Sequence, residues 1–204
     1  MLPDSNIFLN VKTVLLVTAH PDDETLWAGG TILTHPEIRW TIITLTRKSD
    51  IDRAPKFFKA AEIFNAKGFM ADLDDGPEQN PLEISEIQST ILNIIAEKTF
   101  DVIITHHPQG EYTRHRRHEE VSLAVSDLVK KQKLKCKRLL FFAYEDGEKK
   151  YPPRPRKDAD IMINLPKNIR QHKKNIIIKN YGFTLDSFEA NAASNVEAFK
   201  IQGQ

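Results

Sequence analysis

Four short runs of the chain consist almost entirely of β-branched and other apolar residues. They span Lys12–Ala19, Ile38–Thr46, Asp101–His106 and Arg138–Tyr144. A continuous apolar run of this length, without regular polar alternation, is typical of a strand buried on both faces. Such strands occur in parallel sheets covered by helices on both sides, so these runs restrict the chain to a narrow group of architectures.

Helical periodicity separates these runs. Isoleucines recur along one helical face between Ile84 and Ile95, and apolar residues do the same between Val121 and Val129. Alternating strands and helices predict an α/β fold with right-handed crossovers. We therefore expect a three-layer, Rossmann-like architecture, in which a mostly parallel sheet carries helices on both faces.

The totals limit the class of protein. The 204 residues suit one domain, which we expect to cover residues 1–204. A net charge of +1 gives no support for binding to nucleic acid or to an anionic membrane, and the single cysteine, Cys136, excludes an internal disulfide. The N-terminus lacks the features of a signal peptide, and no stretch reaches the roughly 20 apolar residues of a membrane span. These features predict a cytoplasmic protein and leave its oligomeric state open.

The last third of the chain is less regular. Residues Glu145–Asp160 are polar, basic and rich in proline, which predicts a loop. A loop of this length either covers a site or only connects two elements, and the sequence leaves both open. We expect a short edge strand next, and then two helices over Lys167–Lys179 and Thr184–Phe199. Residues from about 165 to 204 would then form a helical extension of the domain.

A histidine and three acids stand where the first apolar run ends. The stretch VTAHPDDETLWAGG contains His20, Asp22, Asp23 and Glu24. Ligands bind at the carboxyl ends of strands in open parallel sheets, so these side chains belong to the expected functional edge. Adjacent carboxylates disfavour joint ionisation unless a cation neutralises them, and a metal would explain the cluster. The alternative is that the acids only cap a helix, since acids are common in the first helical turn.

A second histidine-rich segment, Thr105–Val121, follows the third apolar run. His115 and His118 lie there at the predicted start of a helix. One histidine and one aspartate from the first loop and one histidine from the second would supply three ligands. A fourth position would stay open for water, as in catalytic zinc sites. The same ligand types also suit iron, cobalt or manganese.

Three arginines, Arg114, Arg116 and Arg117, surround His115. They either form an exposed basic loop, or hold substrate or pair with neighbouring acids. Together with Arg47 and Lys48 they favour an anionic small-molecule substrate.

The motifs resemble those of a known family. AHPDDE after a buried strand, followed by WAGGTI and by a later His-x-x-His that enters a helix, resembles the LmbE/PIG-L family of zinc-dependent N-acetylglucosaminyl deacetylases. The resemblance extends from about Val11 to about Tyr144, and more loosely over the rest. It implies an LmbE-like deacetylase domain whose substrate is a small N-acylated molecule.

The resemblance also implies a role for each matching residue. His20, Asp23 and His118 match the family's zinc ligands, and Asp22 matches its general base. His115 matches a histidine that supports the transition state, here as a protonated imidazole beside the developing oxyanion. The implied reaction is hydrolysis of an N-acyl group, in the first place acetyl, from an amino sugar by a zinc-activated water.

Two weaker matches and two departures concern the substrate. Arg53 resembles an arginine that contacts substrate, and Asp75 in LDDGP resembles an Asp-Gly pair of the family, although a plain turn explains it equally well. The family often has His-Pro-Asp-His where this chain has HRRH, which leaves the partner that orients His118 unidentified. The family often has a glycine-rich segment where this chain has TRKSD, Thr46–Asp50.

Two other functions stay open on the same fold. One is hydrolysis of a different amide or sugar conjugate at the same metal site. The other is non-catalytic binding of a small molecule.

Overall fold

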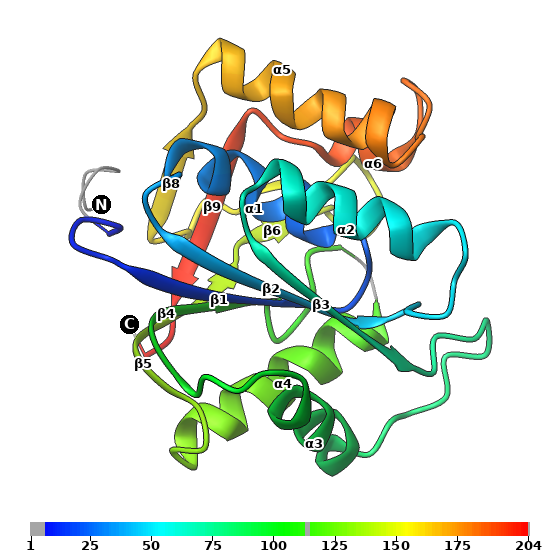
Figure 1. The fold of residues 1–204 in the computed structure, drawn as a ribbon. Helices are drawn as coiled ribbons and strands as arrows, with labels where there is room; N and C mark the ends of the chain where they lie inside the picture. The colour runs from blue at the N-terminus through cyan, green and yellow to red at the C-terminus, as the bar shows by residue number, and fades with distance from the viewer. Residues whose placement is uncertain (1–6, 113–114, 204) are drawn as a thin grey trace.

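The computed structural model describes residues 7–112 and 115–203 of the chain. Its elements, shown in Figure 1, are β1 (Thr13–Thr18), α1 (Asp23–Thr34), β2 (Arg39–Thr46), α2 (Arg53–Ile63), β3 (Lys67–Leu73), α3 (Ile84–Ile94), β4 (Thr99–Thr105), α4 (Arg116–Lys130), β5 (Lys135–Phe142), β6 (Tyr144–Glu145), β7 (Arg154–Pro155), β8 (Ile161–Asn164), α5 (Lys167–Asn175), a π-helix (Ile176–Asn180), α6 (Phe188–Ala192) and β9 (Val196–Ile201).

A seven-stranded sheet forms the middle layer. Its strand order is β3-β2-β1-β4-β5-β9-β8, and the five strands from β3 to β5 are parallel. Helices α3 and α4 cover one face, while α1, α2 and α5 cover the other (Figure 1). The three-layer α/β architecture expected from the sequence is thus confirmed. The strand order changes direction at β1, after which the chain continues on the other side of that strand. Parallel sheets of this kind bind their ligands at such a switch point.

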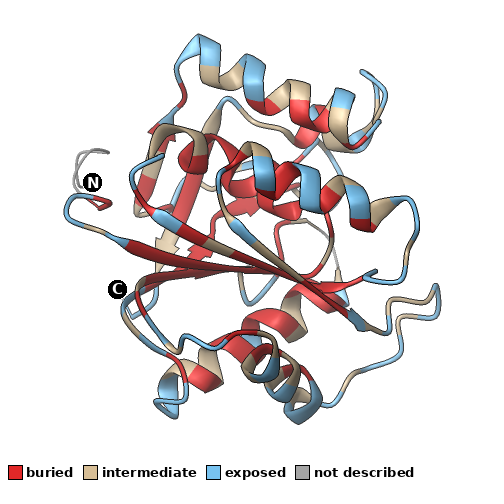
Figure 2. Cartoon of the chain, in the orientation of Figure 1, coloured by how far each residue is buried: buried red, intermediate tan, exposed pale blue. Residues whose placement is uncertain are grey.

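Two hydrophobic clusters fill the space between the layers. Alternate residues of β1 point to opposite faces of the sheet: Val14 and Leu16 join the cluster under α1 and α2, while Leu15 and Val17 join the cluster under α3 and α4. The sheet and the inner faces of the helices are accordingly buried in Figure 2. This two-sided burial explains why the strands read as unbroken apolar runs.

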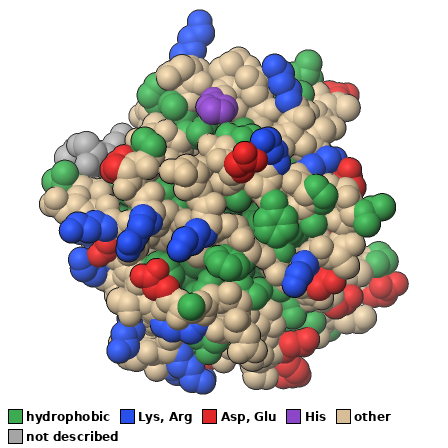
Figure 3. Space-filling model, in the orientation of Figure 1, with side chains coloured by type: hydrophobic (Ala, Val, Ile, Leu, Met, Phe, Trp, Pro, Cys, Tyr) green, Lys and Arg blue, Asp and Glu red, His purple; other side chains and the backbone are tan. Residues whose placement is uncertain are grey.

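The charged surface is mixed. Lysine and arginine lie among aspartate and glutamate on the face shown in Figure 3. Among the described residues, no helix is long and apolar enough to cross a membrane.

The predicted helix over Thr184–Phe199 is wrong. Only Phe188–Ala192 is helical there, and Val196–Ile201 forms β9, which pairs antiparallel with both β5 and β8. Alanine and glutamate give Thr184–Phe199 a helical composition, but pairing of β9 on two sides overrides that weak preference. The C-terminal region is therefore part helix and part sheet, rather than a helical extension. The other predicted terminal helix corresponds to α5 and the π-helix that continues it.

A buried carboxylate attaches β9 to α1. Glu197 is fully buried and accepts hydrogen bonds from Gly30 N at 2.7 Å, from Thr31 N and Oγ1 at 2.6 Å each, and from Lys173 Nζ at 2.7 Å. Sequence reasoning placed this acid on a terminal helix. Its contacts instead join the last strand to the helix whose N-terminal end carries the acidic motif.

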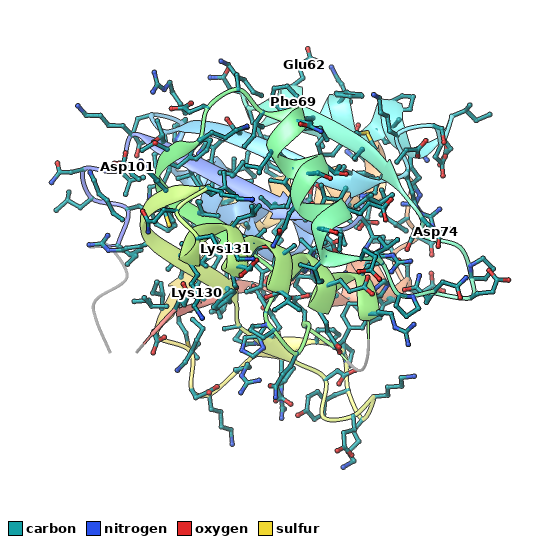
Figure 4. The ribbon with its side chains drawn as sticks, turned by 90° about the horizontal axis from the view of Figure 1, so that it is seen from below. Glu62, Phe69, Asp74, Asp101, Lys130 and Lys131 are labelled. Carbon is teal, nitrogen blue, oxygen red and sulfur yellow. The ribbon has the colours of Figure 1, made fainter. Side chains whose placement is uncertain are left out.

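We expect the Glu197→Ala variant to lose about 3–5 kcal/mol of unfolding free energy, because it leaves the Lys173 ammonium buried without its carboxylate. Urea denaturation measures this loss. The control is Glu62→Ala, at a residue labelled in Figure 4. This variant breaks the exposed Lys59–Glu62 pair and should change stability by less than about 1 kcal/mol. Equal losses in the two variants would contradict this interpretation of Glu197.

Candidate active site

Two loops bring the predicted site residues to one edge of the sheet. The loop after β1 carries His20 and Asp22 and ends at Asp23, the first residue of α1. The loop after β4 ends at His115, directly before α4, and His118 lies in the first turn of that helix. Since β1 and β4 are neighbouring parallel strands, their carboxyl ends place both loops side by side.

Three atoms from these loops form a small triangle. His20 Nδ1 lies 3.2 Å from Asp23 Oδ2 and 3.2 Å from His118 Nε2, and Asp23 Oδ2 lies 3.4 Å from His118 Nε2. A tetrahedral zinc ion, bound at about 2.0–2.1 Å, separates its ligand atoms by about 3.3–3.4 Å. The donor set and its spacing therefore fit zinc or a similar divalent ion.

Buried partners orient two members of the triangle. The Trp27 indole Nε1–H donates to Asp23 Oδ1 at 3.0 Å, which leaves Oδ2 for the triangle. His118 Nδ1 lies 2.6 Å from Glu111 Oε2, which leaves Nε2 facing the other two atoms. A carboxylate on the far ring nitrogen fixes the tautomer and ring position of a ligating histidine. Glu111 is thus the partner of His118 that the HRRH motif left unidentified.

Sequence reasoning misses Glu111. The side chain is fully buried, and burial alone would oppose its ionisation, but the imidazoles of His106 and His118 lower its pKa to about 2. Its other oxygen accepts from the backbone N–H of His107 at 2.8 Å. The available signal was an acid inside a histidine-rich loop, HHPQGEY, between two strand-end motifs.

We expect Glu111→Gln to lower metal affinity about 10–100-fold, because an amide cannot hold two imidazoles as a carboxylate does. Competition against a chromogenic chelator measures the affinity, and circular dichroism checks the fold. Glu148→Gln, at a side chain that is 85% exposed, is the matched control. An affinity equal to that of the wild type would show that Glu111 does not support the site.

His106 belongs to a second group that offers metal-ligand atoms, together with Asp23 and His118. Both of its ring nitrogens already have partners, however. The Ala19 backbone N–H donates to His106 Nε2 at 2.9 Å, and Nδ1 lies 2.8 Å from Glu111 Oε2. A nitrogen that accepts a backbone hydrogen bond has no lone pair left for a metal, so we expect His106 to be structural.

His115 stacks on His118, with ring centroids 4.4 Å apart, and its Nδ1 is buried without a hydrogen-bond partner. With His20 and His118 it forms another group of side chains, among the described residues, that could hold a metal. Burial and the neighbouring imidazoles of His118 and His20 lower the pKa of His115 to about 3. The lowered pKa favours a neutral imidazole in the free protein, and the protonated state expected from the sequence stays a prediction. A neutral imidazole keeps one N–H that it can donate.

Asp22 has a strained backbone, with φ at 112° in the left-handed region. Its N–H donates to Glu24 Oε2 at 3.0 Å, and the Tyr181 hydroxyl donates to Glu24 Oε1 at 2.7 Å. Glu24, the third acid of the motif, thus supports the turn rather than pointing to a ligand. Burial and the carboxylates of Asp23 and Glu24 raise the pKa of Asp22 well above its usual range.

Asp75 lies beside the triangle but contacts protein groups. Its Oδ1 is 3.1 Å from His20 Nε2, and its Oδ2 is 2.9 Å from a guanidinium nitrogen of Arg47. Asp75 thus contacts the ring nitrogen of His20 that lies outside the triangle, just as Glu111 contacts that of His118. Substrate binding by Asp75 stays a prediction, while orientation of His20 is what its contacts favour.

The three arginines around His115 differ. Arg117 is only 1% exposed and donates to Asp74 O at 2.6 Å and to Glu120 Oε2 at 2.5 Å. It therefore pairs with acids and holds the loop that follows β3 in position. Asp74 of this loop is labelled in Figure 4. Arg116 is exposed, and Arg114 lies outside the described residues.

Two connected hollows open at the site. The smaller, about 180 Å³, contains Asp22, and Arg53 reaches it with Nη1 3.4 Å from Asp22 Oδ2. The larger, about 670 Å³, is mainly polar. It is lined by His20, Arg47, Asp75, Gly76, Pro77, Gln79, His115, Arg116 and Glu119. Arg53 thus lies at the small pocket, where a residue that contacts substrate is expected. That role stays a prediction.

The sequence profile of the PIG-L family, described as GlcNAc-PI de-N-acetylase, matches residues 15–129. This chain belongs to the PIG-L family. The match spans both loops and every atom of the triangle, and it confirms the resemblance found in the motifs.

Solved structures with the same fold are distant in sequence. N,N′-diacetylchitobiose deacetylase from Pyrococcus horikoshii has a TM-score of 0.75 at 14% identity, with 98% of this chain and 87% of that chain covered. Teicoplanin deacetylase in a zinc-inhibited form has a TM-score of 0.62 at 13% identity, covering 83% and 84%. GalB, the 4-carboxy-2-hydroxymuconate hydratase from Pseudomonas putida KT2440, has a TM-score of 0.63 at 14% identity, covering 94% and 95%. One fold thus carries more than one chemistry, so the reaction has to be argued from the site.

Proposed function

We propose that this PIG-L family member is a metal-dependent hydrolase that removes an N-acyl group, in the first place acetyl, from an amino sugar. The observation that carries the proposal is the triangle of His20 Nδ1, Asp23 Oδ2 and His118 Nε2, with Asp22 in the adjoining pocket. The family and the deacetylases with the same fold support hydrolysis of an acetylated amine over hydration. Cytoplasmic location stays a prediction, and the oligomeric state stays open.

His20, Asp23 and His118 would hold the metal, zinc or another divalent transition ion. When bound, the metal would polarise the acyl oxygen and make water at the site easier to deprotonate. The remaining chemistry falls to side chains of this chain.

Asp22 acts as the proton carrier. It takes a proton from water as the water oxygen attacks the amide carbon. It then delivers that proton to the nitrogen as the C–N bond breaks, which releases an amine and a carboxylate. Burial and the neighbouring acids raise the pKa of Asp22, so that its carboxylate binds a proton more readily than an exposed aspartate does.

His115 stabilises the negative charge that develops on the acyl oxygen. The centre of its ring lies 4.5 Å from that of His20, and its buried Nδ1 has no hydrogen-bond partner among the described residues to release first. A neutral N–H donor suffices for this role, since catalytic oxyanion sites are often built from neutral donors.

The larger pocket suits the sugar. Its polar lining offers donors and acceptors for hydroxyl groups, and Arg116 and Arg47 favour a sugar that carries a negative group. Arg47 is partly neutralised, since it contacts both Asp75 and Asp50. Arg47 therefore contributes less net positive charge to the pocket.

The test is amine release from a panel of N-acetylated sugars and sugar conjugates, with zinc-loaded protein. Release that stops with a chelator and in the Asp22→Asn variant supports the proposal. Binding of metal without release from any member of the panel would contradict it, and would favour either a different amide substrate or a non-catalytic binder.

A further inference from the structure

A third hollow borders the small pocket at Asp22 and shares no lining residue with the polar pocket. It has a volume of about 660 Å³, within the range of about 300–1,000 Å³ typical of ligand sites. Tyr112 and Phe188 line both the small pocket and this groove, so the two hollows border each other. The rest of the groove is lined by Asp146, Lys149, Lys150, Tyr151, Pro152, Asp186 and Asn191.

The lining of the hollows changes from polar on one side of Asp22 to apolar on the other. The pocket beside His20 is mainly polar, whereas the groove beyond Tyr112 is mainly apolar. The small pocket between them has Pro21 and Leu26 in its wall as well as the acids. An N-acylated sugar has the same asymmetry, since hydroxyl groups lie on one side of its amide and hydrocarbon lies on the other.

We propose that the groove takes the acyl chain of the substrate, and that the enzyme removes N-acyl groups longer than acetyl. This rests on the proposed function, because the amide must lie at Asp22 for its two halves to reach the two sides. With the sugar in the polar pocket, an acetyl group fills only the small pocket. A longer chain extends past Tyr112 and Phe188 into the groove.

The groove walls are positioned before any ligand binds. Phe188 is 44% exposed, yet it is held edge-on against Tyr112, with ring centroids 5.1 Å apart. On the other wall, the Arg154 guanidinium lies 3.7 Å from the centre of the Tyr151 ring, and the Tyr151 hydroxyl donates to Glu145. A wall fixed in advance needs less ordering on binding, which favours affinity.

The Glu145–Asp160 loop gains a function under this proposal. It supplies Tyr151 and Pro152 to the groove, on the segment that links β6 to β7. The sequence left open whether this loop covers a site or only connects two elements, and its place beside the groove favours the first.

The experiment compares acyl lengths on one amine. Wild-type protein is assayed with N-acetyl-, N-butanoyl-, N-hexanoyl- and N-octanoylglucosamine. We expect kcat/KM to rise about three- to fourfold for each methylene buried in the groove, until the groove is filled. Phe188→Ala should reduce the octanoyl-to-acetyl ratio of kcat/KM at least tenfold, because it removes the wall shared by pocket and groove.

The control is Phe58→Ala, at another phenylalanine of similar exposure, 48%, which lines a different hollow between α2 and β2. It should leave the octanoyl-to-acetyl ratio as in the wild type. Calorimetric binding of octanoyl- and acetylglucosamine to metal-loaded Asp22→Asn protein gives a second readout that does not depend on turnover. Tighter binding of the octanoyl compound is expected there.

The outcomes separate the two proposals. Cleavage of the acetyl compound, with equal or slower cleavage of longer chains, would overturn the acyl groove and keep the hydrolase. Faster cleavage of a disaccharide such as N,N′-diacetylchitobiose, without any effect of acyl length, would assign the groove to a second sugar and also overturn it. Absence of amine release from every compound would instead contradict the proposed function.

Discussion

Replacing Asp22 by asparagine should reduce amine release about 10²–10⁴-fold, the usual contribution of a positioned general base. The asparagine side chain keeps the shape of the aspartate, but its amide is too weak a base to take a proton from water. Asparagine also tolerates the left-handed backbone at this position, where φ is 112°, so the turn should survive. The measurement is kcat on an N-acetylated sugar that the wild type cleaves.

The Asp22→Asn variant should lose the proton carrier and nothing else. Metal content per chain, measured by inductively coupled plasma mass spectrometry, should equal that of the wild type, and so should the melting temperature within a few degrees. Asp158→Asn, on a surface aspartate paired with Arg156, is the matched control and should retain wild-type turnover. Full activity in Asp22→Asn would show that another group carries the proton.

The His118→Ala variant should lose both bound metal and turnover. It removes one corner of the triangle and also leaves Glu111 with a single imidazole partner, His106. We expect metal content to fall to background after dialysis, and amine release to fall to that of a chelator-treated sample. Metal analysis and the kinetic assay on the same preparation test both parts.

A second histidine replacement controls for the loss of an imidazole as such. His172 is exposed on α5, far from the triangle in sequence, and His172→Ala should keep metal and activity. Adding zinc, cobalt or manganese back to chelator-treated wild-type protein identifies which ion restores turnover. A His118→Ala protein that retained metal would shift the ligand set toward His20 and His115.

Local pattern was sufficient for the centre of the fold. The runs that became β1, β2, β4 and β5 are apolar because both of their faces are buried, and that requirement is visible residue by residue. Strand β9 shows the limit of this reasoning. Its residues suit a helix when taken alone, and only pairing with β5 and β8 makes them a strand.

The acidic motif divides in the same way. Chain connectivity alone keeps His20, Asp22 and Asp23 together at the end of a strand, so a site there could be predicted from sequence. Glu24 could not be assigned, because its role depends on Tyr181, which lies 157 residues further along the chain. The protonation of His115 could not be derived from local sequence either, because burial and the approach of two other imidazoles shift its pKa.

The sequence by itself determined the alternation of strands and helices at the centre of the fold, the sheet edge where the site lies, and the residue types available there. Spacing within a few residues fixes these features, because covalent geometry limits where neighbours can go. Only the tertiary structure decided that His118 meets His20 across 98 residues of chain, that Glu111 holds two histidines, and that Phe188 joins Tyr112 at a groove. Such contacts depend on how whole elements pack, and no local pattern in the sequence encodes them.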